Sequence, residues 1–203
     1  MKIKYLAVAV IGIIIIGLVP ATGHAVILDF EFDVAIASLL NTEDPNYGGF
    51  TWDGFIVRNI DSYNTNYTNT QTAPSGNHVV SNFSGVLSTS FGGQVVDLQG
   101  AMFSTWPEFD NHAVWSATSV TMEGYLGGSL VGSSTLANLT KNFQALNTNF
   151  GSFVDEVRII SSASGHYWFM DNLSYNTVPE PSTLLLLGTG LIGLAGFRRK
   201  FRS

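Results

Sequence analysis

Between residues 26 and 177, apolar and polar residues alternate in short runs, and no run keeps a helical period for more than a few positions. A period of two is typical of strands that bury one face. Gly127-Gly128 stands between two such runs and is a good signal for a two-residue hairpin. The nine expected strands are 26–32, 50–57, 78–83, 86–91, 95–103, 119–126, 129–136, 154–161 and 167–175.

Nine short strands without long helices predict an all-β fold, an antiparallel β-sandwich of the jelly-roll type. Two segments depart from the strand pattern. Residues 39–46 predict a short turn of helix, and residues 59–77 predict a long polar loop rich in Asn and Thr. We therefore expect one sandwich domain over residues 26–177.

The N-terminal segment, residues 1–25, has the pattern of a secretory signal peptide. Two lysines precede an apolar stretch of 15 residues, which is short of the ~20 residues that span a bilayer. Gly23 and Ala25 occupy the small-residue positions for cleavage before Val26. The expected product is an exported protein cut by signal peptidase.

Charge and cysteine content exclude several functions for the domain. Residues 26–178 carry three basic residues against 14 acidic ones, a formal charge of −11, which repels nucleic-acid backbones. The chain has no cysteine, so disulfides, thiol catalysis and cysteine-ligated metals are excluded. Solvation, divalent cations and neutral partners such as sugars remain.

The C-terminal segment, residues 178–203, combines three features in a fixed order. Pro179, Glu180 and Pro181 come first, and an uncharged stretch of 16 residues over 182–197 follows. As a helix, that stretch is about 24 Å long against a ~30 Å hydrocarbon core, so it is a marginal transmembrane helix. Basic residues stop the membrane segment and stay cytoplasmic. They are Arg198, Arg199 and Lys200, with Arg202 beyond them.

This order resembles the PEP-CTERM sorting domain of Gram-negative bacteria that make exopolysaccharide. The resemblance implies recognition of the Pro-Glu-Pro tripeptide by the membrane protein exosortase, a transient membrane helix, and delivery to the cell envelope or the extracellular matrix of a biofilm. It implies an address and not an activity. The alternative is an ordinary C-terminal anchor in which the tripeptide occurs by chance.

Acidic residues in the first and last expected strands are candidate metal ligands. Under strict alternation, Asp171 shares a face with Phe169 and Leu173, where a lone carboxylate is costly unless it is paired or bound to a metal. Without a metal, Asp171 would pair with Arg158 or accept hydrogen bonds from backbone amides.

The domain also resembles the galactose-binding-like jelly rolls found among carbohydrate-binding modules. The similar pieces are 28–31, 124–131 and 170–173. The resemblance implies a structural calcium ion held by Glu31 and Asp171, with Asp29 next and backbone carbonyls completing the shell.

Aromatic residues are the candidates for sugar binding. Trp106 lies in a polar stretch, 105–112, and is the expected exposed stacking platform, with Arg58 as a further contact. Trp52 alternates with Phe50 and is expected in the core. The alternative for these aromatic residues is packing.

No pattern of catalytic residues is present, and we expect no enzyme activity. The histidines His78, His112 and His166 are far apart in sequence, and there is no Gly-x-Ser-x-Gly motif and no phosphate-binding loop. The expected function is structural or adhesive and linked to exopolysaccharide. The alternatives are a calcium-stabilised carbohydrate-binding module and, less favoured, a glycan hydrolase that uses two carboxylates.

Overall fold

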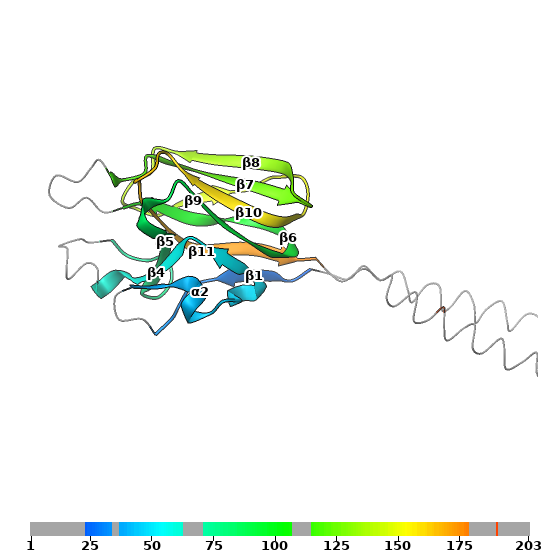
Figure 1. Cartoon of the computed structure of the whole chain (residues 1–203), viewed down its shortest axis with the longest axis horizontal. Coiled ribbons are helices and arrows are strands. Elements are labelled where there is room, and N and C mark those ends of the chain that lie inside the picture. The colour runs from blue at the N-terminus through cyan, green and yellow to red at the C-terminus, as the bar shows by residue number, and fades with distance from the viewer. Residues whose placement is uncertain (1–22, 34–36, 63–70, 107–114, 179–189, 191–203) are drawn as a thin grey trace, which may run out of the picture. The chain divides into compact units, whose positions relative to one another are not determined.

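The computed structural model describes residues 23–33, 37–62, 71–106, 115–178 and 190, and Ala25–Thr177 form one compact unit. This unit is almost entirely β-structure (Figure 1). The strands are β1 Ala25–Leu28, β2 Ala37–Leu39, β3 Thr51–Asp53, β4 Phe55–Asn59, β5 His78–Asn82, β6 Ser88–Thr105, β7 Ser119–Leu126, β8 Ser129–Ala137, β9 Gln144–Asn147, β10 Val154–Ser161 and β11 Trp168–Thr177. The helical turns are α2 Leu40–Glu43, η1 Tyr47–Gly49 and η2 Phe83–Gly85.

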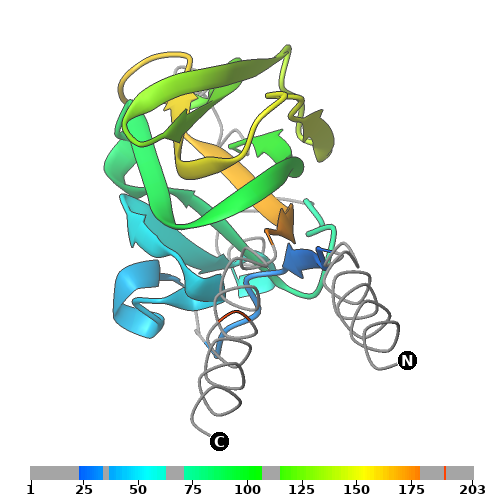
Figure 2. The same cartoon turned by 90° about the vertical axis from the view of Figure 1, so that its right-hand side faces the viewer.

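The long strand β6 joins two antiparallel layers. Its first part, up to Val96, pairs with β10 and β3, and its second part, from Val96 onward, pairs with β11 and β9. The strand therefore passes from one layer to the other near Val96, and Gly93 just before this point has a φ of 131° that favours glycine. In Figure 2 this strand is the green ribbon that descends and then turns upward.

The hydrogen-bonded strands thus form one continuous sheet that is folded over at β6. One layer has the order β3-β6-β10-β7-β8, and the other has β2-β4-β5-β11-β6-β9, with β1 beside β11. The expected all-β antiparallel sandwich is confirmed.

The main core lies between these layers. Met122 and Ile159 from one layer join Phe103, Trp168 and Met170 from the other in a single buried cluster. A second cluster lies outside β11 and contains Ile60, Ala73, Val79, Trp106 and Phe169. Since β11 is covered on both faces, four consecutive residues at its start, 168–171, are all buried.

Several strand boundaries agree with the alternation pattern. The strands β7 and β10 coincide with the expected 119–126 and 154–161, and Gly127-Gly128 connects β7 to β8 as predicted. The expected strand 50–57 is divided at Gly54, whose φ is 77°. The expected strands 86–91 and 95–103 are both parts of β6.

One expectation about the length of a strand and one about the faces of a strand are wrong. The first strand ends at Leu28 instead of residue 32, before Phe30 with its left-handed φ of 57°. The expected alternation of burial nevertheless continues, since Leu28 and Phe30 are buried and Asp29 and Glu31 are exposed. In β11, Asn172 has a φ of 49° beside a register shift, so the side chains beyond it change face. Leu173 therefore packs in the main core with Met170, whereas Phe169 belongs to the second cluster.

The signal peptide and the tail helix lie almost wholly outside the described residues, as does the 63–70 part of the polar loop. Within the described part of the chain, no helix is long and apolar enough to cross a bilayer.

Candidate functional site

Asp171 on β11 is fully buried, as its apolar neighbours predicted. Its carboxylate accepts hydrogen bonds from the backbone N–H of Ser75 at 2.9 Å and of Asn172 at 2.7 Å, and from the Ser75 hydroxyl. Backbone amides thus compensate the buried carboxylate. Arg158, the alternative partner that the sequence suggested for Asp171, forms an ion pair with Glu156 instead.

Glu31 binds the same segment that Asp171 binds, residues 75–78. Its Oε1 accepts hydrogen bonds from the N–H of Asn77 at 3.0 Å and of His78 at 2.9 Å. Its Oε2 lies 3.1 Å from Nδ1 of His78. Gly76 is required here, because it has a φ of 46° and an added Cβ would collide with the Glu31 carboxylate. Two acids that are far apart in the sequence therefore hold one segment, residues 75–78; we call this arrangement the carboxylate clasp.

The electrostatics of the clasp follow from its burial. Desolvation raises the pKa of Asp171 to about 6, with a smaller contribution from the nearby negative charge of Glu31, while the hydrogen bonds from Ser75 and Asn172 act in the opposite direction. Asp29 contacts the clasp only through its Oδ1, which lies 3.5 Å from the backbone N–H of Glu31, among the contacts described. It accepts a hydrogen bond from the hydroxyl of Tyr47, whose pKa burial raises to about 12.

The clasp fits a calcium ion only in part. Glu31 and Asp171 supply the hard oxygen atoms that Ca²⁺ prefers, and they lie close enough to interact electrostatically. All four of their carboxylate oxygens, however, accept hydrogen bonds or lie beside the His78 ring. Within the described residues, no three His, Asp or Glu side chains form a group that could hold a metal. A bound ion would need further oxygens from the main chain.

Trp106 is not the exposed platform that its polar surroundings predicted. It is 7% exposed and packs against Tyr167 and Phe169, with ring centroids 4.8 and 5.0 Å away. The guanidinium of Arg58 lies 4.7 Å from the centre of its ring, and Arg58 Nε donates to the hydroxyl of Ser81. The expectation of exposure failed because the second cluster, outside β11, buries this indole. Trp52 is buried as expected.

An open groove of about 510 Å³ lies across β3, β6 and β10. Asp53 is exposed at one side of it, and Asp155 and Glu156 are half-buried at the other. Gly92 lies between them, where β10 approaches so closely that a Cβ would lie 2.6 Å from the main-chain oxygen of Asp155. We call this the outer groove.

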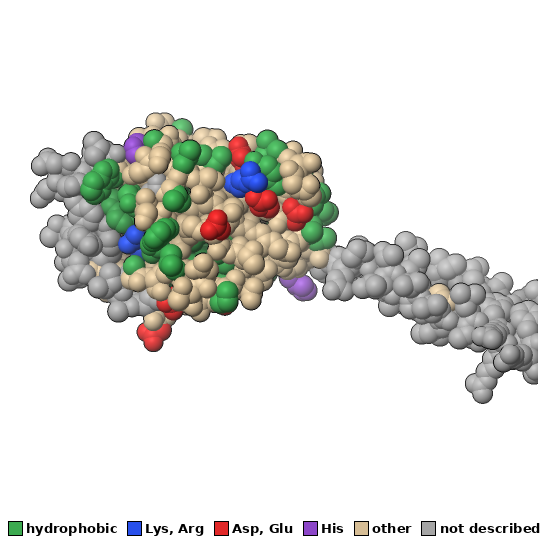
Figure 3. Space-filling model, in the orientation of Figure 1, with side chains coloured by type: hydrophobic (Ala, Val, Ile, Leu, Met, Phe, Trp, Pro, Cys, Tyr) green, Lys and Arg blue, Asp and Glu red, His purple; other side chains and the backbone are tan. Residues whose placement is uncertain are grey.

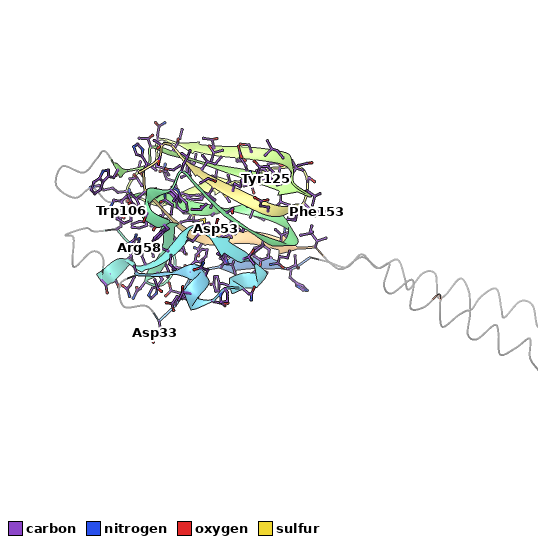
Figure 4. The ribbon with its side chains drawn as sticks, viewed as in Figure 1. Asp33, Asp53, Arg58, Trp106, Tyr125 and Phe153 are labelled. Carbon is purple, nitrogen blue, oxygen red and sulfur yellow. The ribbon has the colours of Figure 1, made fainter. Side chains whose placement is uncertain are left out.

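Next to the outer groove, four side chains of β7 and β10 form a connected network. Arg158 Nε lies 2.7 Å from Glu156 Oε1, and its guanidinium lies 4.2 Å from the centre of the Tyr125 ring. The hydroxyl of Tyr125 donates to Glu123 at 2.7 Å, which raises the pKa of Tyr125, and Glu156 raises the pKa of Arg158. Such fixed donors, acceptors and an aromatic ring suit hydroxyl-rich, uncharged ligands. Figure 4 labels Asp53 and Tyr125.

Sequence reasoning missed this groove for a physical reason. Its acids come from β3 and β10, which are separated by about half of the chain, and only the pairing of both strands with β6 brings them together. The sole sequence signal was the outward position of Asp53 and Glu156 in alternating strands. The motif residues Pro179, Glu180, Pro181, Arg198, Arg199 and Lys200 lie outside the described residues.

Comparison with known proteins identifies the tail. Residues 177–200 match the PEP-CTERM protein-sorting motif, as the sequence predicted. The motif implies export and a membrane-anchoring C-terminal tail. A search of curated proteins found no match.

Comparison with solved structures supports the fold. A DUF4465 family protein from Bacteroides caccae ATCC 43185 is similar with a TM-score of 0.53 and 13% identity, over 75% of this chain and 98% of that one. The K2 cleaved adhesin domain of Lys-gingipain has a TM-score of 0.42 and 11% identity, over 76% and 98%. A CBM32 module of a GH31 protein, bound to GalNAc, has a TM-score of 0.30 and 17% identity, over 49% and 73%. The similarity to the DUF4465 family protein is one of fold.

Proposed function

We propose that this chain is an exported, non-catalytic β-sandwich protein that exosortase sorts to the cell envelope or the extracellular matrix, where it has a structural or adhesive role linked to exopolysaccharide. The observation that carries the proposal is the sorting motif at residues 177–200, which begins at the last residue of β11. The domain is thus the cargo of that motif. Its acidic surface and its lack of cysteine suit an extracellular, polysaccharide-rich setting.

The sorting step is tested in a bacterium that makes exosortase and exopolysaccharide. We expect the wild-type domain in the outer envelope or matrix fraction. A variant with Pro179→Ala, Glu180→Ala and Pro181→Ala should stay in the inner-membrane fraction with its tail intact. The same localisation of both proteins would contradict sorting by exosortase.

A second candidate function is carbohydrate binding, and the outer groove favours it. Asp53 is exposed at the groove, and the neighbouring Tyr125–Arg158 pair is held in place by Glu123 and Glu156. Sugar hydroxyls bind to such carboxylates, and pyranose rings pack on aromatic rings. With Trp106 buried, this groove replaces the Trp106 loop as the place where we propose that a polysaccharide binds.

Binding is measured by co-sedimentation of the domain with exopolysaccharide from the same host. Tyr125→Ala and Asp53→Asn should each weaken binding by about tenfold, the effect of losing one or two contacts. Asp33→Asn, which changes an acid that the groove does not contain, is the control. Equal binding by all four proteins would exclude the groove. Release of reducing sugar that Asp53→Asn abolishes would instead establish a hydrolase.

We further propose that calcium, where present, binds at the clasp through Glu31 and Asp171 and stabilises the 75–78 segment. Calcium should then raise the melting temperature of the wild-type protein and leave that of Asp171→Asn unchanged. If neither calcium nor EDTA changes the melting temperature of the wild-type protein, calcium binding at the clasp is excluded.

A further inference from the structure

The last residue of β11, Thr177, lies at one end of the sandwich, where strands of both layers meet. Val96 on β6 pairs with Thr177 on one side and Val154 on the other, so the last residue of β11 lies in the middle of this end. The side chains of Val95 and Phe153 flank that point, and both are exposed. Phe153 lies at the right-hand end of the domain in Figure 4. We call this region the Thr177 end.

Other exposed apolar residues come to the same end from separate strands. Leu126 closes β7 beside Gly127, whose N–H donates to Asp155, the neighbour of Val154. Leu130 of β8 pairs with Tyr125, and Ile27 of β1 pairs with Ser174, three residues before Thr177. Five apolar side chains from five segments are therefore exposed around the Thr177 end. In Figure 3, hydrophobic side chains are visible at the right-hand end of the domain as well as over its left-hand part.

The length of the connection to the tail limits how far this end can lie from a membrane. Only residues 178–181 separate Thr177 from Ser182, where the apolar run of the sorting tail begins. A chain of this length spans at most about 17 Å when fully extended. The lipid headgroup region is roughly 5–8 Å thick on each side of the bilayer, so this connection leaves Thr177 at most about 12 Å beyond it. A tail inserted in the bilayer therefore holds the Thr177 end close to the membrane surface.

We propose that the Thr177 end is a membrane-contact surface, on which Val95, Leu126 and Phe153 rest in the interfacial layer of the bilayer while the tail is inserted. The partner is a zwitterionic lipid surface. Asp97 and Asp155 lie at this end, and the neighbouring Arg158 is paired with Glu156, so anionic lipids are repelled. The inference rests on the anchoring tail and needs no polysaccharide ligand.

The natural absence of cysteine gives a direct test with the full, tail-bearing chain. Phe153→Cys carries an environment-sensitive fluorophore, and the chain is reconstituted in phosphatidylcholine vesicles that contain a headgroup-level quencher lipid. The control is Leu87→Cys, because Leu87 is 47% exposed and Phe153 48%. Leu87 lies beside the other end of β10, because its carbonyl oxygen accepts a hydrogen bond from the backbone N–H of Ser161, the last residue of that strand.

We expect lipid quenching at position 153 and none at position 87, and a decrease at position 153 when phosphatidylglycerol replaces phosphatidylcholine. With the fluorophore moved to Leu126→Cys, Phe153→Ser should lower quenching by about fivefold or more, since it withdraws a half-exposed phenyl ring from the lipid. Equal quenching at 153 and 87 would overturn the proposal. So would a response at 153 that follows protein density instead of quencher density, because that indicates contact with a second copy.

Flotation of the same vesicles separates this proposal from the anchoring on which it rests. Chains that float with lipid but show no quenching at position 153 have an anchored tail and no membrane-contact surface. Chains that do not float lack the anchor itself.

Discussion

At the scale of single residues, Asp171 links the charge of the clasp to the stability of the domain. Its folded-state pKa of about 6 lies above the ordinary aspartate value of 3.8, because burial disfavours the ionised form. Folding therefore favours the protonated acid. The free-energy cost of burying the ionised Asp171 carboxylate is fully present above pH ~6. It is relieved as the pH falls toward ~4 and the carboxylate becomes protonated.

Asp171→Asn tests this linkage, since the amide keeps an oxygen for the N–H of Ser75 and has no charge to bury. The wild-type protein should gain free energy of unfolding relative to Asp171→Asn as the pH falls from about 7.5 to 4, by up to about 3 kcal/mol. Urea unfolding at several pH values measures the difference. A difference that stays constant with pH would mean that Asp171 titrates normally in the folded state.

Trp106 is a second residue whose role the fold decides. Because it packs in the second cluster under Arg58, Trp106→Ala should lower the free energy of unfolding by about 3–5 kcal/mol, as for other buried aromatic residues. The matched control is Trp115→Ala, since Trp115 is 47% exposed. We expect that control to lose less than about 1 kcal/mol. Similar losses in both variants would contradict the assignment of Trp106 to the core.

At the scale of elements, β6 depends on glycines where other strands come closest. Gly100 has a φ of 140°, and a Cβ there would collide with the main-chain oxygen of Leu146 on β9. Gly100→Ala should therefore separate β9 from β6 and lower the free energy of unfolding by about 2–4 kcal/mol. Gly128→Ala is the control, because Gly128 also has a positive φ of 77° but has no atom within 4 Å of an added Cβ.

In the control, Gly128→Ala, the free energy of unfolding should fall by only about 1 kcal/mol, which is the cost of placing an alanine at a positive φ. Thermal unfolding of the two variants measures the contrast, and hydrogen exchange of the β9 amides locates it. If both variants lose the same amount, the close approach of β9 to β6 has no energetic weight.

Regular strands were predictable from sequence, whereas their junctions were not. Alternation gave the bounds of β7 and β10 because both strands lie in regular antiparallel ladders with one buried face. It failed at Asn172, where a left-handed residue changes the face of the strand without changing its composition. The strands 86–91 and 95–103 were expected to be separate, but the hydrogen bonding continues between them through β6.

For the candidate sites too, local features were predictable from the sequence, whereas contacts between distant segments were not. The burial of Asp171 was predictable from its apolar neighbours. Its partners in the 75–78 segment were not, because they lie almost 100 positions away in the sequence. The outer groove and the Thr177 end depend on which strands are neighbours in space, and composition carries no information about that pairing.

At the scale of the whole molecule, a negatively charged sandwich is joined to a sorting tail by a very short connection. Residues 26–178 carry a formal charge of −11, and the basic cluster at 198–202 lies beyond the apolar run. This asymmetry suits a domain that is transported across a membrane while the basic end stays behind. The motif match begins at Thr177, so processing at the tripeptide would release the sandwich with almost no residual tail.

We propose that exosortase processes the tail at this motif and delivers the sandwich, and mass spectrometry of the mature protein tests this most directly. The protein is recovered from the envelope and matrix of a host with exosortase, and from the same host after deletion of exosortase. We predict that peptides from Leu184 onward are absent in the first case and present in the second. An intact tail on protein recovered from the host with exosortase would contradict the account.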